Sequence, residues 1–378
     1  MSITRFAFPT TIHFGNGARK LAGPRLKELG LKRPLIVTDR GLAELPPIAE
    51  LKADLEAAGL APSVYGGVHG NPTAKQVTAG AAAYRKHKAD CVVGVGGGAA
   101  LDVAKVVGVL ATHPGNPIEY AWDHPKVRHI TEQRPYFIAL PTTSGTGSEV
   151  GRSSVISEDD THIKRVIFSP LILARTVYAD PELTVGLPPA VTAAVGMDAL
   201  THNIESYLSP AYHPMCDGIA LEGTRIAARS LLTAVKEPKN LAARGDMMMA
   251  SMMGAVAFQK DLGAVHSCAH ALGTVCDLHH GLANALMIEP VMRFNQEAVP
   301  EKFEELARVV GAGTGRAFVP WLERLKHQIG LPAGLKAAGV LKKNFPRLVE
   351  VALADGCHTT NPRPCTAADF ERFFEEAF

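Results

Sequence analysis

The sequence predicts a two-domain chain in which an α/β nucleotide-binding domain precedes an all-helical domain. At 378 residues, the chain exceeds the usual size of a single domain. Short β-branched runs alternate with helical patterns as far as residue 182, and only helical patterns follow. Such alternation is typical of a largely parallel sheet with helices on both faces. We therefore expect domains at 1–182 and 183–378, with an active site in the cleft between them.

The strands of the first domain are expected to be buried on both faces, because their apolar residues are consecutive rather than alternating. They are predicted at 34–39, 90–95, 136–143 and 174–181. Helical stretches lie between them, at 50–61, 73–90 and 99–111. The second domain begins with three long helical patterns, at 189–209, 217–235 and 240–259.

The composition argues against several functional classes. The net charge is only +2 and no dense Lys/Arg block occurs, so we expect no nucleic-acid or membrane-surface partner. No apolar run reaches membrane-spanning length, and the N-terminal residues lack a signal-peptide pattern. The six cysteines are scattered and form no CxxC pair, as is typical of thiols in a reducing compartment. These features predict a cytoplasmic protein that acts on a small molecule.

A glycine-rich turn, GVGGGA at 94–99, joins one predicted strand to the next helix. Glycines let the backbone approach a phosphate, and the helix N-terminus offers free N–H groups, although such a turn can also be only a tight connection. A dinucleotide signature usually has an acidic residue about 20 positions downstream. Here the best acid, Asp39, lies upstream at the end of an earlier strand. It is either a turn residue or a partner of the ribose 2′-hydroxyl that repels a 2′-phosphate.

Two other loops are candidates for ligand contacts. PTTSGTGSE at 141–149 follows a strand and is rich in glycine and hydroxyl groups, which suits either a polar ligand or an exposed loop. Asn71 lies in the turn GNPT at 70–73.

The helical half carries residues typical of a metal site. In GMDALTHNIE, Asp198 and His202 are four residues apart and share one helix face, as do His266 and His270 in GAVHSCAHALG. The segment DLHHG then supplies His279 and His280. Buried polar residues need partners, so two such pairs in apolar helices favour a metal site over chance clustering. HExxH is absent, so the zincin protease pattern does not apply.

These motifs together resemble the iron-containing (group III) alcohol dehydrogenases, which share the fold of dehydroquinate synthase. The resemblance spans residues 8–364 and rests on GGG-x-x-x-D-x-AK, PTTSGTGSE, ADPELT, GMDAxxHxIE and a His-x3-His-x9-His run. It implies an NAD(P)-dependent alcohol dehydrogenase that uses NAD rather than NADP, with Fe(II) as the metal. The donor types suit Zn(II) equally well. A homodimer or a higher homo-oligomer is also implied.

The resemblance assigns roles to individual residues. It implies that Asp198, His202, His266 and His280 bind the metal, and that His270 is an active-site histidine that relays a proton. His280 is preferred to His279 because it lies 14 residues after His266. The implied cofactor contacts are Asp39, Asn71, Gly96, Gly97, Gly98, Asp102, Thr142, Thr143 and Thr146.

The chain departs from the family pattern at two places. Ala99 stands where relatives carry serine, so the glycine loop would bind pyrophosphate through backbone N–H groups alone. FQKDLG at 258–263 is one residue shorter than the corresponding segment of relatives. The shorter segment weakens the match of Phe258 to the family's ring-stacking residue.

The FQK-x-LG-x-VHS and LHHG features resemble the 4-hydroxybutyrate dehydrogenase branch of the family. A carboxylate-bearing substrate would need a cationic clamp, for which Arg152 and Lys260 are candidates unless they are solvated surface charges. We expect oxidation of a short primary alcohol or an ω-hydroxy acid such as 4-hydroxybutyrate, or the reverse reaction. The alternatives are a lactaldehyde or 1,2-diol oxidoreductase, a metal-dependent hydrolase or lyase, and a catalytically silent nucleotide-binding protein.

Overall fold

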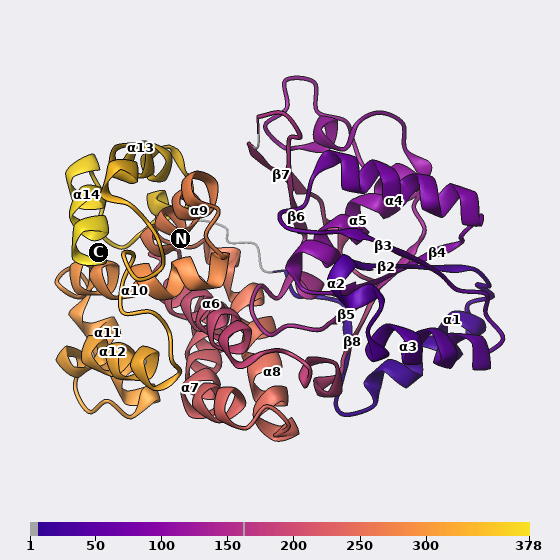
Figure 1. The fold of residues 1–378 in the computed structure, drawn as a ribbon. Helices are drawn as coiled ribbons and strands as arrows, with labels where there is room; N and C mark the ends of the chain where they lie inside the picture. Colours follow the sequence, from indigo (N-terminus) through magenta and orange to yellow (C-terminus); the bar gives the residue numbers. More distant parts are fainter. Residues whose placement is uncertain (1–6, 162) are drawn as a thin grey trace. The chain divides into compact units, whose positions relative to one another are not determined.

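The computed structural model describes residues 7–378 apart from 162, and it divides into two compact units (Figure 1). The α/β unit comprises Pro9–Thr143 and Gly147–Thr184. The helical unit comprises residues 7–8, Ser144–Thr146 and Val185–Phe378. The predicted fold class is therefore confirmed. A single cut after residue 182 misses one feature, because Ser144–Thr146 belongs to the helical unit. Residues 1–6 of the first predicted domain lie outside the described part.

Six parallel strands form the sheet of the α/β unit, in the order β1-β8-β5-β4-β2-β3. Their bounds are β1 Thr11–Phe14, β2 Pro34–Asp39, β3 Ser63–Val68, β4 Cys91–Gly96, β5 Tyr136–Pro141 and β8 Thr176–Ala179. All four predicted strands are present and almost entirely buried. The sequence did not reveal β1 and β3, which are the partly exposed edge strands and lack a continuous apolar run.

Helices cover both faces of this sheet. Their bounds are α1 Ala22–Glu28, α2 Arg40–Ala43, α3 Pro46–Ala57, α4 Ala74–His87 and α5 Gly98–Thr112. Helices α1 and α3 pack on one face, and α4 and α5 lie on the other (Figure 1). A separate antiparallel hairpin, β6 Ser153–Ser157 and β7 Lys164–Phe168, follows the PTTSGTGSE loop.

The strand order reverses between β2 and β4. The chain passes from β2 outward to β3, whereas β4 returns to the other side of β2 and is followed outward by β5 and β8. In parallel α/β sheets, ligands bind at the carboxyl ends of the strands at such a reversal. Asp39 ends β2, Gly96 ends β4 and Thr142 follows β5, so this edge collects the residues expected to bind a nucleotide.

The helical unit contains nine α-helices among the described residues. They are α6 Pro189–Leu208, α7 Pro214–Lys236, α8 Leu241–Ala257, α9 Ala264–Cys276, α10 His280–Gln296, α11 Pro300–Val310, α12 Phe318–Gln328, α13 Phe345–Ala354 and α14 Ala367–Glu376. No helix in the described part of the chain is long and apolar enough to cross a membrane.

Helix α6 lies at the centre of this unit and packs against α7, α8 and α10. Every residue from Gly196 to Leu208 is buried. A polar side chain on this helix loses its water and must find a partner within the protein. The positions of Asp198, His202 and Glu205 on α6 are therefore strong constraints on what surrounds them.

The glycine turn after β4 generates the first testable prediction. Gly96 has φ +147°, and a Cβ there would lie 2.6 Å from Ala100 Cβ and 3.2 Å from Asp39 Oδ2. Gly96→Ala should lower the free energy of unfolding by about 2 kcal/mol or more, because the backbone conformation and the contact are both unfavourable. Urea denaturation measures this change.

Gly108→Ala is the matched control in the same segment. Gly108 lies within α5, where the nearest atom to a new Cβ is Pro135 Cγ at 3.9 Å. This variant should be as stable as the wild type or slightly more stable, because alanine favours a helix over glycine. Equal stability of the two variants would contradict the account of the turn.

Candidate active site

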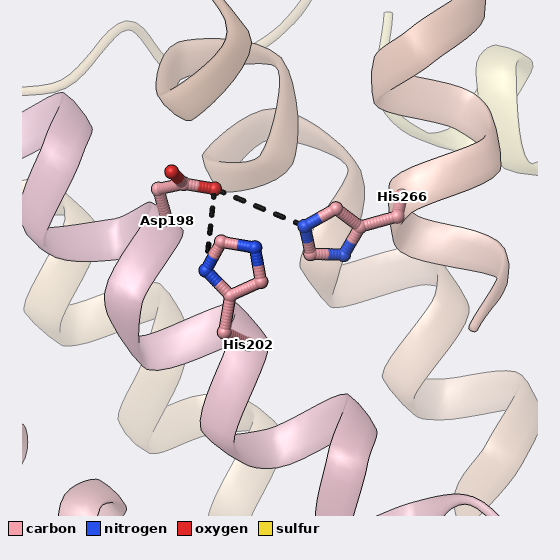
Figure 2. A group of neighbouring side chains, drawn as sticks. All are labelled: Asp198, His202 and His266. Carbon is pink, nitrogen blue, oxygen red and sulfur yellow. Dashed lines mark ion pairs between the residues drawn. The ribbon is translucent and has the colours of Figure 1, made fainter. Parts of the chain in front are cut away.

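Three helices of the helical unit bring four predicted metal ligands together. Helix α6 supplies Asp198 and His202 one turn apart, α9 supplies His266, and α10 begins at His280. Figure 2 shows Asp198 joined by dashed lines to His202 on its own helix and to His266 on another helix. Asp198 Oδ1 lies 3.8 Å from His202 Nδ1, 3.8 Å from His266 Nε2 and 3.4 Å from His280 Nε2.

Asp198, His202 and His266 offer ligand atoms within 4.8 Å of one another, as a divalent cation needs, and His280 adds a fourth donor beside Asp198. With metal–ligand bonds of about 2.1 Å, neighbouring donors of a tetrahedral site lie about 3.4 Å apart. The three separations from Asp198 Oδ1 equal or slightly exceed that value. His202 Nδ1 is buried and has no hydrogen-bond partner among the described residues. A buried nitrogen of this kind needs an explanation, and a bound cation would provide one.

The charge states also suit a metal site. Burial keeps the pKa of His266 and of His280 well below its ordinary value, so both imidazoles are neutral and present lone pairs. Burial opposes ionisation of Asp198, yet His202, His280, His266 and Asn284 together hold its pKa below the usual range. The cluster thus offers one carboxylate and, in His266 and His280, neutral imidazoles, which are the forms that bind metals.

Glu205 orients one of these imidazoles. Its Oε2 lies 2.5 Å from His266 Nδ1, and its Oε1 accepts the Val265 N–H at 2.8 Å. Engagement of Nδ1 leaves Nε2 of His266 to face Asp198, an arrangement common around metal-binding histidines. Burial raises the pKa of Glu205 to about 7. The sequence analysis did not assign Glu205, although it ends the motif GMDALTHNIE and lies on the same face of α6 as Asp198.

Asn284 is a second contact to the cluster that the sequence analysis did not assign. Its Nδ2 donates to Asp198 Oδ1 at 2.7 Å and lies 3.3 Å from Nε2 of both His266 and His280. Its Oδ1 is buried and has no partner among the described residues. The available signal was spacing, because Asn284 follows His280 by one turn of α10.

His270 does not contact Asp198 and instead pairs with Asp355. His270 Nδ1 lies 2.8 Å from Asp355 Oδ2, while Asp355 Oδ1 accepts from Ser267 Oγ and from the Cys357 N–H, both at 2.8 Å. Burial opposes ionisation of Asp355, but His270 and these donors hold its pKa well below the usual range. The His270 ring stacks on that of His280, with centroids 5.4 Å apart. Asp355 is 85 residues from His270 in the chain, so no local pattern revealed it.

Phe258 and His279 both lie near the cluster but have different surroundings. The Phe258 ring lies 5.5 Å from the His202 ring, so Phe258 forms an apolar boundary of the cluster. His279 is exposed and is the N-cap of α10, where its Nδ1 accepts the Leu282 N–H at 3.4 Å. His279 therefore supports the helix on which His280 stands.

The structure gives the two clamp candidates different surroundings. Lys260 is buried, forms an ion pair with Asp217 and donates to the Tyr207 carbonyl at 3.4 Å. Its charge is already neutralised at the C-terminal end of α6, so we do not retain Lys260 as a substrate clamp. Arg152 belongs to the α/β unit, where its guanidinium lies 5.5 Å from the centroid of the Phe168 ring.

The predicted cofactor residues gather at the carboxyl edge of the sheet. Asp39 Oδ1 accepts the Leu42 N–H at 2.9 Å, and its Oδ2 lies beside Gly96. Gly97 is the N-cap of α5 and has no side chain to accept a hydrogen bond from the first N–H groups of this helix. Thr142 N donates to Gly96 O at 3.0 Å, and a Cβ on Gly97 would lie 3.2 Å from the Thr143 side chain. This cradle fits a phosphate group.

Four cofactor candidates remain, of which Gly98 is the first residue of α5. Asn71 follows β3, and its carbonyl lies 3.5 Å from Gln76 Nε2. Thr146 belongs to the helical unit. Asp102 accepts hydrogen bonds from Ser148 Oγ at 2.6 Å and Val155 N at 2.8 Å and lies 3.5 Å from Lys105 Nζ. The Asp102 carboxylate is thus hydrogen-bonded within the protein, and through Ser148 it supports the PTTSGTGSE loop.

The parallel sheet of the α/β unit and the helical unit with its Asp/His cluster define a two-domain protein with an α/β half and an all-helical half. The chain belongs to the iron-containing alcohol dehydrogenase family. The family's iron-containing alcohol dehydrogenase domain matches residues 9–181, and its C-terminal domain matches residues 192–378.

Individual relatives match over almost the full chain. A 4-hydroxybutyrate dehydrogenase from Cupriavidus necator is 40% identical over 97% of this chain and 98% of its own. The crystal structure of a 1,3-propanediol oxidoreductase has a TM-score of 0.94 at 37% identity and covers all of both chains. A sulfoacetaldehyde reductase from Bifidobacterium kashiwanohense, in complex with NAD+, has a TM-score of 0.92 at 29% identity. It covers 100% of this chain and 99% of its own.

The contacts of Asn284 lead to a prediction about metal affinity. Asn284→Leu keeps a similar volume but removes the donor that fixes Asp198 Oδ1. The dissociation constant for Zn2+, measured by calorimetric titration of metal-stripped protein, should rise about 10- to 100-fold.

Asn295→Leu is the control, because it removes a buried carboxamide from the same helix at a distance of three turns. Asn295 bonds to Asn361 and not to the Asp/His cluster. This variant should lose stability but retain its Zn2+ affinity. Unchanged affinity in Asn284→Leu would show that Asn284 does not position Asp198.

Proposed function

We propose that this chain is an NAD-dependent, metal-dependent dehydrogenase of short primary alcohols or ω-hydroxy acids, or a reductase of the corresponding aldehydes. The observation that carries the proposal is the cluster of buried Asp198, His202 and His266 with partly exposed His280, in which His202 Nδ1 has no hydrogen-bond partner among the described residues. With one carboxylate and three imidazoles as protein donors, a substrate oxygen would enter as a fifth ligand, an expansion that catalytic metal sites can undergo.

The helical unit would hold a divalent cation, Fe(II) or Zn(II), through these four side chains. When bound, the cation supplies Lewis-acid polarisation of the substrate oxygen, and the nicotinamide ring accepts or donates the hydride. The protein's own contribution is to keep the donors in place: Glu205 orients His266, and Asn284 orients Asp198. Phe258 excludes water beside His202.

His270 is proposed to relay the substrate proton to solvent. Its side chain is 32% exposed, so it can exchange protons with water. The Asp355 carboxylate accepts from Nδ1–H, which leaves Nε2 free to accept a proton. Hydrogen atoms are assigned from these partners, as is usual for a histidine. Asp355 thus acts as a positioning residue for the relay.

The α/β unit is proposed to bind NAD at the reversal of the sheet. Backbone N–H groups from Gly98 onward would bind the pyrophosphate, because Ala99 offers no hydroxyl group. Asp39 would accept a hydrogen bond from the ribose 2′-hydroxyl and repel the 2′-phosphate of NADP. The sulfoacetaldehyde reductase, which was crystallised with NAD+, supports this assignment.

The substrate class rests on the relatives. The 40% identity with a 4-hydroxybutyrate dehydrogenase favours an ω-hydroxy acid. Arg152 remains the candidate clamp for its carboxylate, as a cation partly engaged with Phe168. The similarity to a 1,3-propanediol oxidoreductase favours the alternative, which is a diol-type oxidoreductase.

The direct test is a panel of short alcohols, diols and ω-hydroxy acids with NAD and added Fe(II) or Zn(II) under anaerobic conditions. We expect turnover that disappears with a chelator and returns with the metal, with 4-hydroxybutyrate among the best substrates. Metal binding without NADH binding, measured by nucleotide fluorescence, would instead favour a hydrolase or lyase. NAD binding without turnover of any alcohol would favour a silent nucleotide-binding protein.

Cofactor preference tests the role of Asp39. Asp39→Asn removes the negative charge and keeps the cap on the Leu42 N–H, whereas Asp39→Gly removes both. Both variants should raise the ratio of kcat/KM for NADP to kcat/KM for NAD about tenfold or more. Removal of a charge repulsion of about 1.4 kcal/mol is enough to change this ratio tenfold. Asp39→Gly should also lose about 0.3 kcal/mol of stability, because it removes the cap. An unmoved preference in both variants would refute the ribose assignment.

Asp355→Asn tests the proton relay. The carboxamide cannot hold Nδ1–H of His270 in the same way, so kcat should fall about 10- to 100-fold. The metal content and the KM for NAD should stay unchanged, since Asp355 contacts neither group. Ser267→Ala is the control, because it removes another donor to Asp355 without touching His270. Loss of metal in parallel with activity would show that Asp355 acts on the metal site instead.

A further inference from the structure

We infer that His270, Asp355 and Cys357 form a second cation site, selective for a thiophilic divalent ion such as Zn2+, beside the cluster around Asp198. The potential ligand atoms of these three residues all lie within 4.8 Å of one another. His270 stands on α9, Asp355 follows α13, and Cys357 begins the 3-10 turn Cys357–Thr360. All three side chains are partly exposed, so an ion can enter from solvent.

This group of donors differs from the cluster around Asp198 because one of its donor atoms, Cys357 Sγ, is sulfur. A thiolate, an imidazole and a carboxylate together favour zinc and chemically similar ions over magnesium or calcium. The cluster around Asp198 offers only oxygen and nitrogen. The two sites should therefore be distinguishable by the chemistry of the ion that each prefers.

The present spacing is close to what such an ion requires. Neighbouring donors around zinc lie about 3.5 Å apart, given bonds of about 2.0 to 2.3 Å. His270 Nδ1 and Asp355 Oδ2 are closer than this, at 2.8 Å, and the widest separation in the group is below 4.8 Å. Shifts of about 1 Å would suffice.

Asp355 is already held in a suitable orientation. Ser267 Oγ and the Cys357 N–H both donate to Oδ1, so the oxygen that faces His270 is Oδ2. A cation would replace the contact between His270 and Oδ2 and the hydrogen bond of the Cys357 thiol to the Asp355 carboxylate. The two donors on Oδ1 would continue to orient the carboxylate, which is the support that metal-binding carboxylates commonly have.

Binding has a defined proton balance. Burial and the nearby Asp355 carboxylate raise the pKa of the Cys357 thiol well above its ordinary value, so the thiol is protonated in the free protein. Formation of the sulfur–metal bond releases that proton to solvent. The proton on Nδ1 of His270 leaves, and Nε2 takes up one proton, so the imidazole stays neutral. One proton is therefore released for each ion bound.

The site would have a functional consequence that rests on the proposed function. The cation takes both His270 and Asp355, which are the two members of the proton relay proposed above. Occupancy would remove the relay without displacing the first metal. Excess Zn2+ should therefore inhibit turnover of an enzyme that already holds its catalytic metal.

Cobalt provides the direct test, because Co2+ bound to a thiolate gives a near-ultraviolet sulfur-to-metal charge-transfer band. The full-length, metal-stripped protein is titrated with Co2+, with Zn2+ competition afterwards. The band should grow with Co2+ in wild type, be absent in Cys357→Ser and disappear as Zn2+ replaces Co2+. Cys276→Ser is the matched control, since Cys276 is also partly exposed but lies outside the group, beside Asn344. A missing band in wild type, or an equal band in Cys357→Ser, would overturn the inference.

Two further arms separate this inference from the proposed function. Asp198→Asn should abolish turnover yet retain the band, because it alters only the first cluster. A band in a wild-type protein that turns over no alcohol would leave the second site standing and refute the dehydrogenase. In an active enzyme, the Zn2+ inhibition constant should rise at least tenfold in Cys357→Ser, with each protein compared to its own uninhibited rate. Equal Zn2+ inhibition of the wild type and of Cys357→Ser would show that ion binding at this second site does not inhibit the enzyme.

Discussion

Burial of the Asp198 carboxylate is the constraint on which the helical unit depends. A carboxylate inside a helix that is surrounded on all sides is stable only with close compensating partners. Those partners come from three helices: His202 on α6, His266 on α9, and His280 and Asn284 on α10. The same residues that satisfy the carboxylate are those that offer lone pairs to a cation. Folding of this unit therefore also brings the candidate metal ligands together.

The packing around the cluster depends on small residues at close approaches. A Cβ on Gly281 would lie 2.3 Å from the Ala194 carbonyl oxygen, so the start of α10 can approach α6 only with glycine there. Gly254 allows a similar approach of α8 to His202. In the α/β unit, Gly96 plays the corresponding part between β4 and Asp39. Both candidate sites thus depend on backbone contacts that a methyl group would prevent.

The features that could be predicted from the sequence are those with a local pattern of residues. Contacts between residues far apart in the chain could not be predicted. Continuous apolar runs located β2, β4, β5 and β8, while the partly exposed edge strands β1 and β3 carry no such run. Spacing of four residues placed the Asp198 and His266 pairs on helix faces. Asp355 reaches His270 across 85 residues, which no local pattern can reveal. The ion pair of Lys260 with Asp217, 43 residues away in the chain, is likewise not visible in a local pattern.

The central claim is that four side chains of the helical unit bind one catalytic cation. The most direct measurement is anomalous diffraction at the metal edge from crystals of protein loaded with one equivalent of Fe(II) or Zn(II). The account predicts a strong peak bonded to Asp198, His202, His266 and His280. A peak at other residues with none at this cluster, or full activity in crystals that show no peak at this cluster, would contradict it.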